Sequence, residues 1–98
     1  MTYNATKKGT ETMTERTRQT ISARLSIVER QARLEVSLNQ ETFFHHGLRQ
    51  AADCLRENGS GIPENLANQL AVSEESKQQM RTKIERCQSI LADLEDLI

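Results

Sequence analysis

The stretch Asn58-Gly-Ser-Gly-Ile-Pro63 (NGSGIP) holds the single proline of the chain and two of its four glycines. It separates two long segments of helical periodicity. Gly59 suits the left-handed conformation that ends many helices, and Pro63 can begin the next helix because the first residues of a helix need no amide partner. We therefore predict a turn at residues 58–62 between two helices. The expected fold is all-α, a long helical hairpin.

The segment before the turn has the apolar spacing of a long helix over residues 12–57. Thr12-Met-Thr-Glu15 fits a capping box at its start, and residues 1–11 are polar and aperiodic, which predicts a flexible N-terminal tail. Ser37-Leu-Asn-Gln40 leaves open a break near residues 38–40, although no proline requires one and we favour a continuous helix. The main apolar stripe comprises Ile21, Leu25, Val28, Ala32 and Val36, followed after a change of phase by Phe44, Leu48, Ala51 and Leu55.

The segment after the turn, residues 63–98, has the most regular heptad pattern of the chain. Ser73-Glu-Glu-Ser76 either caps a new helix there or lies inside a continuous one. Because a two-helix hairpin has little core, we predict that residues 12–98 form a single domain that a homodimer completes as a helical bundle. The predicted dimer or core stripe alternates steps of four and three: Met80, Ile84, Cys87, Leu91, Leu94 and Ile98.

Composition agrees with this architecture and narrows the function. Of 98 residues, 36% are hydrophobic and only 3% aromatic, which suits narrow apolar stripes better than a wide core. A net charge of −1 argues against a general electrostatic grip on nucleic acid or an anionic membrane. No segment resembles a signal peptide or reaches the roughly 20 apolar residues of a membrane span, so we expect a cytoplasmic protein with Cys54 and Cys87 reduced.

Motifs for catalysis or metal binding are missing from the sequence. His45 and Glu41 lie one helical turn apart, but His46 points about 100° away from His45, which leaves a metal site incomplete. The sequence has no phosphate loop, nucleophile elbow or paired-cysteine zinc motif. We therefore expect neither an enzyme nor a cofactor, and no metal. The arginines between residues 16 and 33 spread around the helix, which makes direct DNA binding a minor alternative.

Both phenylalanines and both histidines of the chain lie in Gln40–Arg49, QETFFHHGLR. Neighbouring helical residues face different directions, so Phe43 and Phe44 cannot both enter one core; that both are buried within a homodimer remains an open alternative. Leu34 and Leu38, together with Ile27, lie off the main stripe on a second face. We predict a partner-binding surface formed by Leu34, Leu38, Phe43, Phe44, His45 and Leu48.

The layout of residues 12–98 resembles that of small all-helical bacterial antiactivators, which bind quorum-sensing transcription regulators. The resemblance implies a non-catalytic protein that inhibits or sequesters a regulator by occupying its dimerisation or DNA-binding surface. Type III secretion chaperones share the same general layout. A secretion or assembly chaperone is therefore the first alternative, and a dimeric DNA-binding protein is the second.

Overall fold

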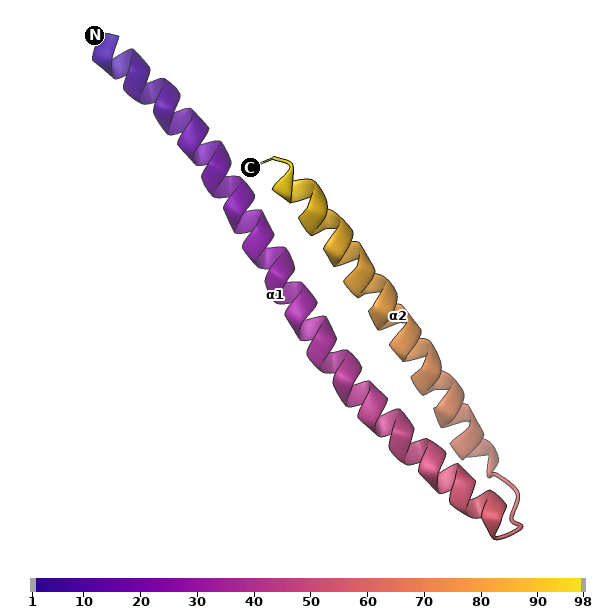
Figure 1. The fold of residues 1–98 in the computed structure, drawn as a ribbon. Coiled ribbons are helices and arrows are strands. Elements are labelled where there is room, and N and C mark those ends of the chain that lie inside the picture. Colours follow the sequence, from indigo (N-terminus) through magenta and orange to yellow (C-terminus); the bar gives the residue numbers. More distant parts are fainter. Residues whose placement is uncertain (1, 98) are drawn as a thin grey trace.

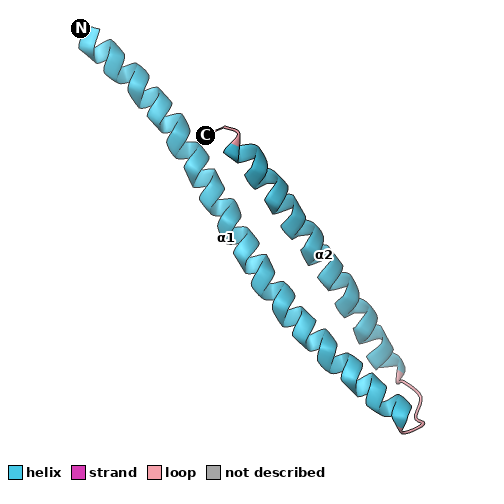
Figure 2. Cartoon of the chain, in the orientation of Figure 1, coloured by secondary structure: helices cyan, strands magenta, loops and turns pink. Residues whose placement is uncertain are grey.

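The computed structural model describes residues 2–97, which form two long helices joined by a short turn (Figure 1). Helix α1 spans Thr2–Glu57 and helix α2 spans Glu64–Glu95. The described residues are helical except for the turn and the C-terminal end (Figure 2), and the helices lie side by side in opposite directions. The prediction of an all-α helical hairpin is confirmed.

The turn ends α1 through a pair of backbone hydrogen bonds around Gly59. The Gly59 amide donates to the Arg56 carbonyl at 3.0 Å, and the Ser60 amide donates to the Leu55 carbonyl at 2.9 Å. This is a Schellman motif, and it requires the left-handed conformation that Gly59 adopts at φ 74°. Pro63 then precedes the first residue of α2 and accepts a hydrogen bond from the Ala67 amide at 3.1 Å. The sequence NGSGIP therefore reverses the chain as predicted.

Both helices are longer or more continuous than some of the sequence signals suggested. α1 begins at Thr2 and not at Thr12, so the predicted capping box lies inside the helix and the bounds differ from the predicted tail at residues 1–11. That segment contains no proline, and a single Gly9 costs only about 1 kcal/mol against alanine, which a long helix tolerates. No break occurs near residues 38–40, as favoured, and Ser73–Ser76 lies within a continuous α2.

The helices meet along one heptad seam. Two contacts show that the helices run antiparallel in a constant register. Arg24 pairs with Glu95 at 3.2 Å, and His45 contacts Glu74 at 3.6 Å. The step from Arg24 to His45 along α1 equals the step from Glu95 back to Glu74 along α2. Alternating steps of four and three define a two-helix coiled-coil packing. The seam residues, all buried or half-buried, are from α1 Ile27, Gln31, Leu34, Leu38, Glu41, His45, Leu48, Ala52 and Leu55, and from α2 Leu66, Leu70, Ser73, Lys77, Met80, Ile84, Cys87, Leu91 and Leu94.

The phase predicted for α1 is wrong. The stripe residues from Ile21 to Val36 are exposed, as Leu25 at 64% illustrates, and the seam instead uses Ile27, Leu34 and Leu38, which the prediction placed on a second face. In the second half of the stripe Phe44 and Ala51 are also exposed, whereas Leu48 and Leu55 do lie in the seam. The heptad was hidden because three of its positions are polar, namely Gln31, Glu41 and His45. On α2 the predicted stripe does lie in the seam from Met80 to Leu94, while Ile98 lies outside the described residues.

Two further features of the described chain bear on its environment. Neither helix holds a stretch long and apolar enough to cross a membrane within residues 2–97. Cys54 is exposed and Cys87 is buried in the seam, and both are free thiols.

Truncation of a seam residue should destabilise the hairpin far more than truncation of an exposed one. Ile84 is buried against α1, so Ile84→Ala should lower the free energy of unfolding by about 2 to 4 kcal/mol through lost burial and a residual cavity. Val72→Ala removes a mostly exposed side chain from the same helix and should cost less than about 0.5 kcal/mol. Urea unfolding at one fixed protein concentration measures both. Equal losses of stability in the two variants would contradict the burial of Ile84 in the seam.

Candidate functional site

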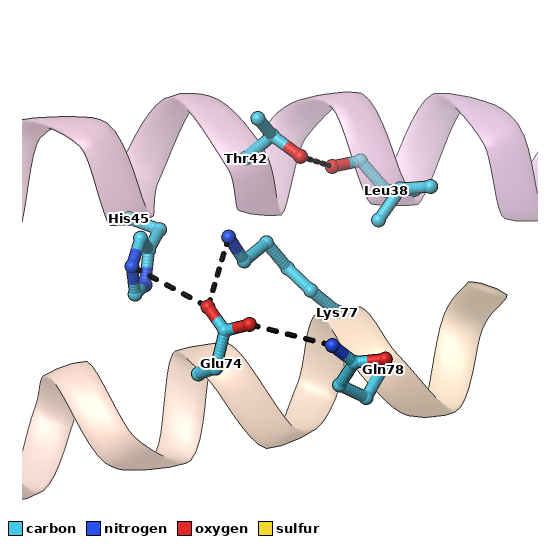
Figure 3. A network of polar contacts seen from close by, with 6 residues as sticks. All are labelled: Leu38, Thr42, His45, Glu74, Lys77 and Gln78. Carbon is cyan, nitrogen blue, oxygen red and sulfur yellow. Dashed lines mark hydrogen bonds and ion pairs between the residues drawn. The ribbon is translucent and has the colours of Figure 1, made fainter.

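A polar cluster interrupts the seam between the two helices (Figure 3). We call it the seam cluster; it consists of His45 from α1 and Glu74, Lys77 and Gln78 from α2. The Glu74 Oε2 atom lies 3.1 Å from Lys77 Nζ and 3.6 Å from His45 Nε2. The other carboxylate oxygen of Glu74 accepts a hydrogen bond from Gln78 Nε2 at 3.5 Å. Glu74 is thus the common acceptor of the seam cluster and its link between the helices.

The electrostatics of the seam cluster centre on the same carboxylate. The hydrogen bond from Lys77 holds the pKa of Glu74 below its ordinary value of 4.5; burial acts in the opposite direction, and Gln78 and His45 add smaller lowering effects. His45 and Lys77 are themselves buried, whereas about half of the Glu74 side chain is exposed. The cluster therefore places two polar side chains inside the seam and lets solvent reach the group that pairs with them.

Beside the seam cluster, two polar atoms are buried without a hydrogen-bond partner among the described residues. They are Ser73 Oγ, on a residue only 1% exposed, and His45 Nδ1. Each unpaired buried polar atom costs on the order of 1 to 3 kcal/mol. The seam around the seam cluster is therefore weaker than an apolar seam of the same length would be.

The seam cluster has the chemistry of a structural contact. Within the described part of the chain, no three His, Cys, Asp or Glu side chains lie close enough together to hold a metal ion. Glu74 is already paired with the Lys77 ammonium, which would repel a cation, and the exposed His46 is turned away from His45. A buried polar contact of this kind commonly fixes the register of a coiled coil.

The outer face of α1 carries the most unusual surface of the molecule. An aliphatic stripe runs along it, with no residue of α2 covering it, and Figure 1 shows α1 continuing beyond the C-terminal end of α2. Contiguous solvent-exposed apolar side chains are typical of binding surfaces. The aliphatic stripe consists of Ile21, Leu25, Val28, Ala32 and Val36, all exposed.

Two turns further along α1 lies an aromatic pair, Phe43 and Phe44. Phe43 is 83% exposed and Phe44 is 54% exposed, and together with Asn39 and Gln40 they line a shallow open hollow. By helical geometry Phe43 continues the direction of the aliphatic stripe, while Phe44 points about 100° away, toward one edge of the hairpin. The pair therefore presents apolar surface in two directions.

The structure divides the predicted partner-binding residues between two environments. Leu34, Leu38 and Leu48 are half-buried and His45 is buried in the seam, whereas Phe43 and Phe44 are exposed. The aromatic pair is therefore the part of this set that is most accessible to a partner while the hairpin stays closed. The aliphatic stripe was predicted as the main stripe of α1 and was not included in the partner-binding surface. Its spacing was a usable signal, since the step of four from Ala32 to Val36 breaks the heptad that a two-helix seam requires.

No protein-family model matches the chain, and neither a curated protein nor a solved structure shows significant similarity to it. The interpretation of the surfaces therefore rests on the residues themselves.

Acid should remove the contribution of Glu74 to stability. Because its pKa is lowered in the folded state, its pairing stabilises the hairpin above about pH 4.5 and is lost as the pH falls through the folded-state pKa. Glu74→Gln should therefore be less stable than wild type at pH 7, and the difference should shrink below pH 4.5. Thermal unfolding from about pH 7 to pH 3 measures this.

Glu75→Gln provides the matched control, because Glu75 is exposed on the adjacent position of α2 and has no ion pair among the described residues. Its stability difference from wild type should stay small across the same pH range. A Glu74→Gln difference that stays constant with pH would contradict the proposed role of the carboxylate.

Proposed function

We propose that this protein is a non-catalytic interaction module that binds a regulatory protein and thereby inhibits or sequesters it. A transcription regulator is the partner that we favour, in line with the resemblance to antiactivators. In this proposal the protein acts in the cytoplasm as a homodimer. The observation that carries the proposal is the exposure of the aromatic pair on α1, Phe43 at 83% and Phe44 at 54%, which the hairpin leaves uncovered.

The aromatic pair is the anchor that we assign to the partner contact. Aromatic side chains dominate the energetics of many interfaces, and Phe43 and Phe44 together are two of the three aromatic residues in the chain. Phe43 is 83% exposed, so its ring contributes little to the stability of the hairpin itself. Gln40, Asn39 and the exposed His46 surround the pair and supply the polar rim that such a hot spot normally has.

The shape and charge of the molecule support binding through an apolar helix face. A partner helix could lie along α1 with its apolar residues against the pair, which is a common mode of helix recognition. The net charge of −1 provides no strong electrostatic attraction, so the apolar contact must supply most of the affinity.

Removal of the Phe43 ring should weaken partner binding without destabilising the protein. Phe43→Ala should lower the affinity for the regulator by about 2 kcal/mol or more, roughly thirtyfold, because a hot-spot aromatic is lost. The free energy of unfolding should change by less than about 0.5 kcal/mol, since the side chain is exposed. A photo-crosslinking amino acid at position 43, followed by mass spectrometry, identifies the partner, and calorimetric titration then compares the affinities.

Leu97→Ala is the control variant for this experiment. Leu97 is also mostly exposed and lies beyond the end of α2, so its truncation removes apolar surface without touching the aromatic pair. Its affinity should equal that of wild type. If Phe43→Ala destabilises the protein while the folded fraction binds the regulator normally, the aromatic pair is a structural element and the proposed contact is wrong.

A further inference from the structure

We infer that the aliphatic stripe of α1 packs against the aliphatic stripe of a second copy of this chain, antiparallel, about a two-fold axis beside Val28. This inference rests on the homodimer included in the proposed function and names the surface that forms it. The contact differs from the seam between α1 and α2, and it leaves both hairpins intact.

The hairpin cannot cover the aliphatic stripe from within. α2 ends at Glu95, whose carboxylate pairs with Arg24, so Ile21 lies beyond the last turn of α2. The other stripe residues face away from the seam, because Ile27, Leu34 and Leu38 occupy the positions that meet α2. A second molecule is therefore needed to remove these side chains from water.

The spacing of the stripe is self-complementary. The steps from Ile21 through Leu25, Val28 and Ala32 to Val36 are four, three, four and four, which read nearly the same in either direction. When a second α1 is turned end for end, Ile21 meets Val36 of the partner subunit and Leu25 meets Ala32 of the partner subunit. The two Val28 side chains lie beside the axis. A two-fold interface requires such reciprocal pairs, and a large side chain opposite a small one allows close packing.

The area is sufficient for a specific contact. The stripe is about 22 Å long, and each of its four larger side chains can bury on the order of 100 Å². Two copies, together with the aliphatic parts of flanking arginines, therefore bury on the order of 1,000 Å² in total, near the lower limit for stable interfaces. The aromatic pair begins two turns after Val36, and helices that cross at an angle diverge beyond their contact. It stays outside the interface and available to a regulator.

The charges beside the axis provide a further signature. Glu29 flanks Val28, so the two-fold axis brings the Glu29 carboxylates of both copies to the same side of the contact. Arg33 lies 3.7 Å from Glu29 in each chain and offsets part of their repulsion. Neutralisation of this carboxylate should therefore strengthen the dimer.

Sedimentation of the purified full chain tests the contact. Wild type at micromolar concentration should show twice the chain mass of 11.2 kDa. Leu25→Asp should raise the dimer dissociation constant at least a hundredfold. Ala32→Glu should have the same effect, and glutamate has the advantage that it favours the helical conformation. Circular dichroism should show that both variants keep their helices, because both positions are exposed. Glu29→Gln should tighten the dimer severalfold, and Val72→Asp on α2 should leave it unchanged.

Disulfide trapping tests the position of the axis. In a Cys54→Ser and Cys87→Ala background, Val28→Cys should oxidise readily to a covalent dimer, because its symmetry mate lies beside it. Ile21→Cys should not, because the two copies of position 21 lie about 22 Å apart in the antiparallel arrangement.

Three outcomes would overturn the inference. A wild-type chain that stays monomeric at 100 micromolar excludes the contact, and equal trapping at both positions indicates a parallel pair. A dimer that resists Leu25→Asp and Ala32→Glu uses another surface; the proposed homodimer would then stand while this contact would not. Since no regulator is present in these measurements, the result with Phe43→Ala remains independent of them.

Discussion

The antiparallel seam between α1 and α2 is the contact on which the rest of the structure depends. A hairpin of two helices has only one internal interface, and each helix can turn only one narrow face toward it. Once Ile27, Leu34 and Leu38 face Ile84, Cys87 and their neighbours, the opposite side of α1 must face solvent or another molecule. The uncovered apolar surface is thus a direct result of the seam, and not a separate feature of the fold.

The sequence predicted the architecture well because its strongest signals are local. Gly59 and Pro63 determine the turn through backbone conformation alone, and the stripe from Met80 to Leu94 has few polar interruptions. The phase of α1 could not be predicted in the same way. α1 has two apolar faces, and the one that packs inside contains Gln31, Glu41 and His45, so a count of apolar residues favours the wrong face. Only the register of α1 against α2 shows which of the two apolar faces of α1 packs inside.

The seam cluster shows the same limit for the candidate site. His45 was predicted as part of the partner-binding surface, yet the structure buries it beside Lys77, opposite a carboxylate that no sequence pattern linked to it. The aromatic pair was recognised as two rings that must diverge, which is a consequence of helical geometry and holds in the structure. Residues whose role follows from their own helix could be predicted, whereas residues whose role depends on the second helix could not.

The two faces of α1 follow different repeats, and this gives any assembly on the outer face a handedness. The seam repeats every seven residues, so its direction around a straight helix shifts by about 20° per heptad. The aliphatic stripe repeats after eleven residues, from Ile21 to Ala32 and from Leu25 to Val36, and its direction shifts in the opposite sense. The angle around α1 between α2 and the stripe therefore widens steadily from Ile21 toward Val36. A molecule that follows the stripe must wind around α1 relative to α2, so the sequence of α1 determines the chirality of the complex.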